Sequence, residues 1–217
     1  MSHVRILALI PILLGVLAGC QDPYYDTMEA FGKHKRALLI SRVESTKTEL
    51  VAGRAAFAQA ATGFRNLVNS APGEHRDSFE AAEDDYEECE DRSRALRRRI
   101  GSVEDVAEAL FNEWENELAN YTSGSLRRTS REQLRTAREK YDDMIASMNR
   151  AADSTEPVLI FFKDQALFLK HNLNGSSLSS LKEEAPRMEE ETNLLRERME
   201  RAEALATEFV TALGTTE

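Results

Sequence analysis

The sequence has few of the residues that build covalent staples, metal centres or disordered linkers. Its 217 residues include two cysteines, four histidines, five prolines and ten glycines, and 7% are aromatic. So little proline and glycine excludes a disordered linker protein. The net charge of −10 argues against general nucleic-acid binding, which depends on Lys and Arg neutralising phosphates. Charged residues make up 30% of the chain, as is typical of long, solvent-exposed helices.

Long hydrophobic runs are also missing, and the longest apolar stretch lies at the N-terminus. Residues 6–18 follow Arg5 and are too short for a helix that crosses a bilayer, which needs roughly 20 residues. A charged start, a short apolar stretch and small residues at its end predict a secretory signal peptide. The sequence Leu17-Ala18-Gly19-Cys20 resembles the lipobox of bacterial lipoproteins. This resemblance implies cleavage before Cys20 and attachment of acyl chains, palmitate among them, to that residue. An ordinary cleaved signal with a chance cysteine is the alternative.

We therefore divide the chain into a signal peptide (1–19), a lipidated tether (20–25), a long-helix bundle (26–213) and a tail (214–217). Cleavage leaves 198 of the 217 residues, with Cys89 as the one remaining unmodified cysteine. We expect Cys89 to be a buried thiol rather than a redox group, because reactive cysteines need an exposed, electropositive setting. In lipoproteins of this type an Asp after the cysteine favours the inner membrane. Gln21 points instead to the periplasmic face of the outer membrane, although Asp22 follows it.

Mostly apolar residues recur every seven positions along most of the chain. In each helical segment two such series, offset by three or four residues, together form the a/d seam of a coiled coil. The first segment has the series 43/50/57/64 with 39/46/53/60/67, and the second has 79/86/93/100/107/114/121 with 82/89/96/103/110. The third has 134/141/148/155/162/169 with 145/152/159/166/173, and the fourth has 181/188/195/202/209 with 178/185/192/199/206/213. Residues 46, 53 and 60 are small, which makes the first seam narrow at its middle.

Turn residues separate the four segments at positions 70–73, 120–124 and 172–176. Short turns join antiparallel neighbours, so we expect an all-α fold: an elongated, antiparallel up-down four-helix bundle with coiled-coil packing. Two helical hairpins that pack less tightly are the structural alternative. We predict a kink at Pro157, because the heptads stay in phase beyond it. Pro186 suggests that the last helix becomes regular near Lys182, with Ser180 and Glu183 as a capping box.

Motifs for catalysis and cofactor binding do not stand out. None of His34, His75 and His171 has the Glu three residues earlier that a di-metal bundle requires. Zinc, haem and phosphate-loop motifs are also missing. A Ser-His-Asp site is not excluded, but no serine lies on a recognisable nucleophile elbow. We expect no cofactor, no metal and no catalytic residue. The acidic stretch 77–91, followed by several arginines, predicts a solvated helix face with i,i+4 ion pairs.

Basic residues are predicted to gather at the end of the bundle beside Cys20. The start of the first helix, the second turn and the end of the chain should meet there. The candidate membrane-facing residues are Lys33, Lys35, Arg36, Arg127, Arg128 and Arg131, with Trp114 and Tyr121 nearby. Each such cation can contribute about 1 kcal/mol near an anionic surface. The alternative is scattered surface charge, with both aromatic side chains in the core.

The opposite end carries a second candidate surface, a partner-docking tip. Its residues are His75, Arg76, Lys170 and His171. A structural account explains the last two equally, because basic residues in the last turn of a helix complement its partial negative charge. In that account the Asn and Gly residues that follow suit a left-handed turn.

Several runs resemble a bacterial family known only as a domain of unknown function. They are Tyr24-Tyr25, 28–36, 103–107 with Phe111 and Trp114-Glu115, 125–128, 156–159 and 168–174. The resemblance spans about residues 24–213. It implies a mostly helical, secreted or lipid-anchored envelope protein of Gram-negative bacteria and transfers no catalytic residue.

Together these features predict a non-enzymatic, lipid-anchored periplasmic scaffold or adaptor. It would contact the membrane through acyl chains and an envelope protein through charged helical faces, and it would not bind nucleic acid. Lipid or amphiphile binding is the second hypothesis, and an enzyme is the third. An open apolar groove would favour the second hypothesis over the first.

Overall fold

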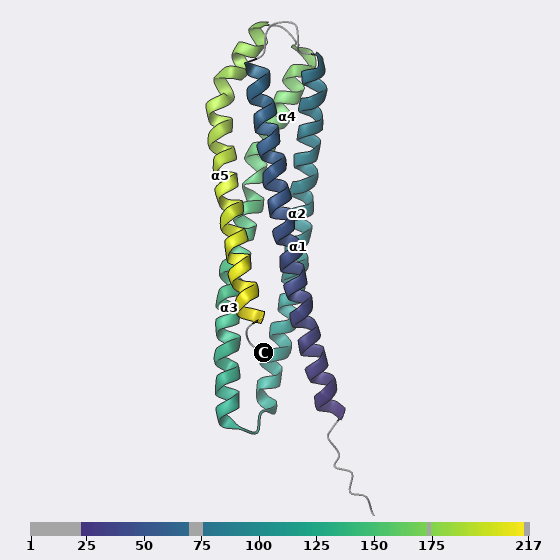
Figure 1. Cartoon of the computed structure of the whole chain (residues 1–217), viewed down its shortest axis with the longest axis vertical. Coiled ribbons are helices and arrows are strands. Elements are labelled where there is room, and N and C mark those ends of the chain that lie inside the picture. Colours follow the sequence, from purple (N-terminus) through teal and green to yellow (C-terminus); the bar gives the residue numbers. More distant parts are fainter. Residues whose placement is uncertain (1–22, 70–75, 173–174, 215–217) are drawn as a thin grey trace, which may run out of the picture.

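The computed structural model describes residues 23–69, 76–172 and 175–214, and almost all of them are helical. The elements are α1 (Pro23–Val68), α2 (Arg76–Glu117), the short 3₁₀ helix η1 (Leu118–Asn120), α3 (Gly124–Asp153), α4 (Thr155–His171) and α5 (Gly175–Gly214). Figure 1 shows them aligned along one long axis. No strand occurs among the described residues.

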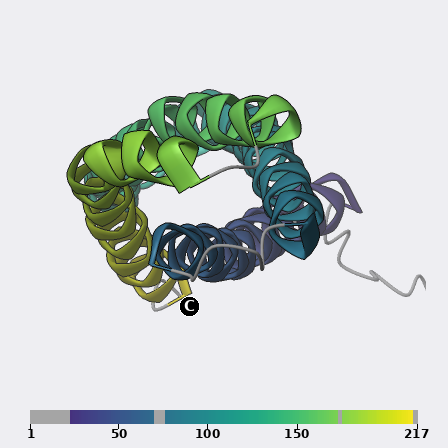
Figure 2. The same cartoon turned by 90° about the horizontal axis from the view of Figure 1, so that it is seen from above.

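The helices form one closed bundle in which α3 and α4 together make the fourth side. Helix α1 packs against α2 and α5, α3 packs against α5 and α2, and α4 packs against α2 and α5. Seen along the axis, these neighbours form a ring (Figure 2). One cluster of buried hydrophobic side chains draws on all five α-helices. The expected antiparallel four-helix bundle is therefore confirmed, in preference to two loosely packed hairpins.

The predicted seam is most accurate in α1, where all nine positions are buried, including Thr46 and Gly53. Gly53 does not mark a close approach of two backbones. A Cβ built there would lie 3.4 Å from the Met199 side chain, which is ordinary contact. The described positions of the α2 and α5 seams are also mostly buried, and Cys89 is fully buried. Tyr121 is an exception, because 38% of its surface is exposed.

The predicted kink at Pro157 is instead a break in the helix at Ser154. Helix α3 ends at Asp153 and α4 begins at Thr155, so Pro157 is the third residue of the new helix. A proline ring clashes with the carbonyl four residues earlier, which here belongs to Asp153. The chain therefore interrupts the helix just where that clash would arise. The seam nevertheless stays in phase, since Met148, Thr155, Phe162 and Leu169 are all buried.

Two further expectations need correction. The second series predicted for α3 and α4 is only partly right, because Ala152 and Ala166 are buried whereas Ile145 and Leu159 are half-buried. The neighbouring positions Met144, Ala151, Val158 and Gln165 are buried as well. In addition, α5 begins at Gly175 rather than near Lys182, and Pro186 lies inside it.

The start of α1 and the α2–α3 connection lie at the same end of the bundle, as expected, whereas α5 stops short of that end (Figure 1). The predicted turn at 70–73 lies outside the described residues. At the other predicted turns, η1 and residues 121–123 connect α2 to α3, and Asn172 closes α4.

Candidate functional surfaces

The predicted lipidation site, Cys20, lies outside the described residues, three positions before the first residue of α1. Lys33 lies within α1, but its side chain is also outside the described set. No helix in the described part of the chain has a segment long and apolar enough to cross a membrane.

The structure divides the other five candidate membrane-facing cations into two groups. Lys35 and Arg36 on α1 are engaged with α2. The Lys35 Nζ lies 2.8 Å from Glu113 Oε2, and the Arg36 guanidinium carbon lies 5.3 Å from the centre of the Trp114 ring. Trp114 is half-buried and donates a hydrogen bond from Nε1 to Ser130 Oγ at 2.8 Å. Lys35 and Arg36 therefore help to fix α1 against α2.

The second group consists of Arg127, Arg128 and Arg131, in the first two turns of α3. All three are exposed, and no contact within the described residues pairs them with an acid. Beside them, Leu126 is 59% exposed and Tyr121 is 38% exposed. We call these five residues the α2–α3 tip. Of the two aromatic residues expected here, only Tyr121 is exposed, because Trp114 belongs to the packed interior.

At the opposite end, the four candidate docking residues are only partly described. His75 and the side chain of Arg76 lie outside the described residues, whereas Lys170 and His171 are exposed in the last turn of α4. Asn172 caps this helix, with its Nδ2 donating to the Phe168 carbonyl at 3.0 Å. The φ of Asn172 is −134°, so it is not left-handed. The expected left-handed turn is therefore not found at this asparagine.

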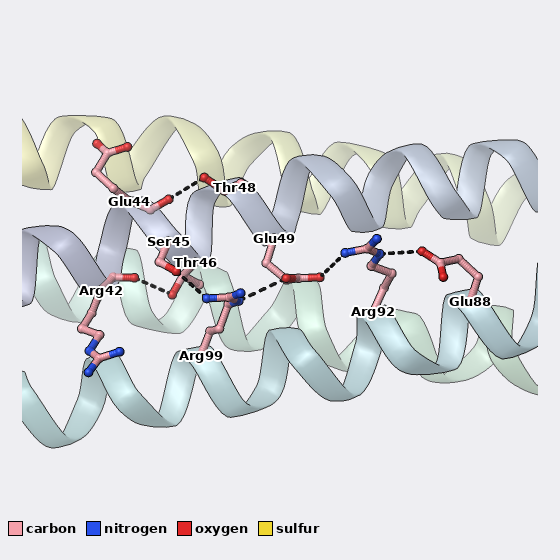
Figure 3. A network of polar contacts seen from close by, with 9 residues as sticks. All are labelled: Arg42, Glu44, Ser45, Thr46, Thr48, Glu49, Glu88, Arg92 and Arg99. Carbon is pink, nitrogen blue, oxygen red and sulfur yellow. Dashed lines mark hydrogen bonds and ion pairs between the residues drawn. The ribbon is translucent and has the colours of Figure 1, made fainter.

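A buried carboxylate links α1 to α2 in the middle of the bundle (Figure 3). Only 7% of the Glu49 side chain is exposed. It accepts hydrogen bonds from Arg92 Nη1 at 3.3 Å and from Arg99 Nε at 3.1 Å. Arg92 also donates to Glu88 at 2.7 Å, and Arg99 donates to Ser45. Every charge in this cluster has a partner, so we assign it a structural role. No local pattern in the sequence marks Glu49, because its partners lie 43 and 50 residues away.

A second polar layer crosses the interior at the α3–α4 break. Ser93 Oγ and Thr155 Oγ1 are 2.7 Å apart, and both residues are buried. Arg198 on α5 donates to Ser154 Oγ, while Arg97 on α2 donates to the Ala152 carbonyl at 3.0 Å. These bonds satisfy polar groups that the interrupted helix leaves open.

The acidic stretch on α2 is a solvated face, as predicted. Glu88 and Glu90 form i,i+4 ion pairs with Arg92 and Arg94 at 2.7 and 3.0 Å. Among the described residues, no group of three or more His, Cys, Asp and Glu side chains is arranged to hold a metal ion. Burial raises the pKa of the Cys89 thiol to about 12, and the nearby Asp85 and Glu88 carboxylates add to this effect.

A partly apolar groove of about 380 Å³ lies between α4 and α5. Its lining includes Ile160, Phe161 and Phe168 on α4 and Leu181 and Met188 on α5. Arg187 and several acids also line it. The groove is open to solvent beside Ile160, which is 52% exposed.

A family model for proteins of unknown function, DUF2959, matches residues 24–213 and so spans all but the ends of the described bundle. No curated protein and no solved structure matches the chain. Because the family model covers most of the sequence, this chain belongs to the DUF2959 family of proteins of unknown function.

Proposed function

We propose that this protein is a lipid-anchored, non-enzymatic scaffold or adaptor in the periplasm of a Gram-negative bacterium. The observation that supports the proposal most is that the bundle is elongated and its interior is packed with hydrophobic side chains. A single hydrophobic core runs through all five α-helices, and charged side chains cover their outer faces. A bundle built this way offers extended outer surfaces for contact with other molecules.

The position of Cys20 supports the anchoring part of the proposal. Cys20 lies three positions before Pro23, and three residues span at most about 11 Å. Acyl chains on Cys20 would therefore hold the start of α1 close to a bilayer. Helix α1 has 46 residues and is about 70 Å long at 1.5 Å per residue. An upright bundle would carry its far end that distance into the periplasm. Gln21 favours the outer membrane.

Site-specific photo-crosslinking in cells tests the adaptor role. A photoreactive residue replaces Leu167 on α4, Leu194 on α5 or Val51 on α1, all of which are exposed. The same residue at the buried Leu96 serves as the matched control. We expect at least one exposed position to capture a specific envelope protein, and the control to capture none. Capture of no protein at any exposed position, together with a stoichiometric bound lipid, would contradict the scaffold.

The groove between α4 and α5 favours a second candidate function, the binding of a lipid or another amphiphile. The groove is mostly apolar, and Arg187 at its edge could pair with an acidic headgroup. Native mass spectrometry of the purified full chain would detect a co-purified amphiphile. Ile160→Asp in the groove should abolish its retention, whereas Leu194→Asp, exposed but outside the groove lining, should not. Equal retention by both variants would exclude the groove as the binding site.

A further inference from the structure

We propose that the α2–α3 tip binds the headgroups of anionic phospholipids and gives the bundle a second membrane contact. The tip consists of Tyr121, Leu126, Arg127, Arg128 and Arg131. This inference rests on the proposed function for the membrane anchor that brings the tip to a bilayer.

The charge of the tip is unfavourable within the protein itself. The N-terminus of a helix carries a partial positive charge and favours acidic side chains. The first turn of α3 contains no acid, and three arginines occupy its first two turns instead. In the described part of the chain these arginines form no ion pair. An arrangement that costs local stability without an internal partner is expected at a functional surface.

Nearby acids are committed to other cations. Glu113 pairs with Lys35, Glu115 pairs with Arg138, and Glu132 pairs with Arg135. Glu117, the last residue of α2, is the acid nearest to η1. Burial raises its pKa, Glu113 raises it further and Lys35 opposes the shift. Among the described residues, no ion pair joins Glu117 to an arginine of the tip. The arginines of the tip are therefore available to an external anion.

Exposed apolar surface at the tip favours a bilayer over a soluble anion. Leu126, with 59% of its surface exposed, is the most exposed of the described large hydrophobic residues. Tyr121, at 38%, has the amphipathic ring that is enriched at membrane interfaces. Arginine beside Leu and Tyr is the combination by which interfacial segments bind anionic lipid surfaces.

The tip is also placed where it can reach a membrane. It lies at the same end of the bundle as the start of α1 (Figure 1). An acyl anchor three residues before α1 therefore holds the tip at the level of the membrane surface. Two separate membrane contacts, one through inserted acyl chains and one electrostatic, would fix how the bundle is oriented.

The test uses the full chain with its N-terminal lipid, reconstituted into vesicles of phosphatidylcholine with or without phosphatidylglycerol. Thr122, exposed in the turn, is replaced by Cys and labelled with an environment-sensitive dye, because the buried Cys89 does not compete for labelling. Quenching of the dye by lipids brominated on their acyl chains reports insertion. We expect quenching that increases with phosphatidylglycerol and decreases at high salt.

Reversal of the three charges, Arg127→Glu, Arg128→Glu and Arg131→Glu, should weaken the phosphatidylglycerol-dependent contact at least about 100-fold, because loss of each cation alone costs about fivefold and the new acids repel the surface. The melting temperature should stay the same or increase, since acids suit this helix end. The matched control reverses Arg98, Arg150 and Arg201, which are exposed and without an acidic partner among the described residues. It should leave quenching unchanged. Equal effects of the two triple variants would overturn the proposal, as would quenching that is independent of phosphatidylglycerol.

The two proposals fail in different ways. If Cys20 carries no lipid, the chain does not stay bound to pure phosphatidylcholine vesicles, whereas the tip still responds to phosphatidylglycerol. If the tip does not bind lipid, the chain stays bound through its acyl chains, but the dye is not quenched. If inorganic polyphosphate changes the fluorescence of the dye but phosphatidylglycerol does not, the tip binds a soluble anion. This result would overturn its assignment to lipid.

Discussion

Glu49 on α1 and Arg99 on α2 form an ion pair of 3.1 Å in which the carboxylate is almost fully buried. The guanidinium remains partly in solvent, with 44% of its side chain exposed. Arg92 approaches the same carboxylate from the other side at 3.3 Å. The pairing of a buried acid with two half-exposed cations fixes the register of α1 against α2.

Replacing Glu49 with Ala should lower the free energy of unfolding by about 1.5–3 kcal/mol, the usual range for hydrogen bonds to charged groups. The two arginines can regain water, which limits the loss. Glu132→Ala is the matched control, because its pair with Arg135 is exposed on both sides. It should change stability little, since solvent screens an exposed pair. Urea unfolding followed by circular dichroism measures both changes, and equal losses would contradict a special role for Glu49.

Cys89 should be inert in the native protein. Its side chain is fully buried, and burial raises its pKa to about 12, so almost no thiolate is present at a pH of about 8. We expect alkylation of Cys89 under these conditions to proceed only as the chain unfolds, and to accelerate in urea with the unfolding transition. An exposed cysteine introduced by Thr122→Cys should react at once. Rapid alkylation of both cysteines in the native protein would contradict this prediction, because it would show that the core around Cys89 opens.

Asp85 should make stability depend on pH. Burial raises its pKa above 3.8, a hydrogen bond from Gln59 opposes the shift, and Asp84 adds to it. The native state then binds this proton more tightly than the unfolded state, so stability falls as pH rises from 3.8 through the native pKa. Asp85→Asn should therefore increase stability at neutral pH by about 0.5 kcal/mol or less and have little effect at a pH of about 3. Melting curves at both values check this. The exposed Glu83→Gln is the control, and a loss of stability at neutral pH in Asp85→Asn would contradict the sign.

Substitution of Lys170 and His171 distinguishes a helix-capping role from a partner-docking role for the last turn of α4. Under the capping account, Lys170→Ala with His171→Ala removes the Lys170 charge, which stabilises the end of α4 by about 0.3–1 kcal/mol, and a polar side chain in the same turn. The melting temperature should fall by a few degrees, and captured partners should be unchanged. Asn172→Ala, which removes a hydrogen bond of 3.0 Å to Phe168, should act in the same direction. An unchanged melting temperature with loss of captured partners would instead support docking.

The sequence predicted the seam of α1 well because each of its positions faces one continuous core. It did less well for α3 and α4, where the buried stripe passes through Met144 and Val158 rather than Ile145 and Leu159. In α3 and α4 the buried stripe is wider than an a/d seam, because Ala152 and Ala166 of the predicted series are buried together with the neighbouring Ala151 and Gln165. Heptad spacing alone does not reveal which side of the predicted stripe is covered by a neighbouring helix.

Pro157 and Pro186 differ in how well local sequence rules predict their effect on the helix. The position of the break before Pro157 follows from the clash with the Asp153 carbonyl, so it could have been predicted to the residue. Pro186 suggests that the last helix becomes regular near Lys182, whereas α5 continues on both sides of this proline. Leu181, seven positions before Met188, is buried in the same seam. Its packing favours the extra helical turns, and the heptad series, which already includes position 181, is a better guide here than the proline.

The α2–α3 tip was partly predictable. The arginines and Tyr121 stood out by composition, but the grouping with Lys35 and Arg36 depended on contacts that only the fold supplies. Glu113 and Trp114 engage those two cations, which leaves the α3 arginines as the exposed basic group.

The account depends most on the lipid at Cys20, and the intact mass of the mature chain purified from bacterial membranes tests it directly. We expect a chain that begins at Cys20 and carries the added mass of a diacylglyceryl group and an N-acyl chain. Its N-terminal peptide should bear the whole addition, and Cys20→Ser should abolish it and release the protein from firm membrane binding. A mature chain without lipid, or a Cys20→Ser chain that remains as firmly membrane-bound as the wild type, would contradict the account.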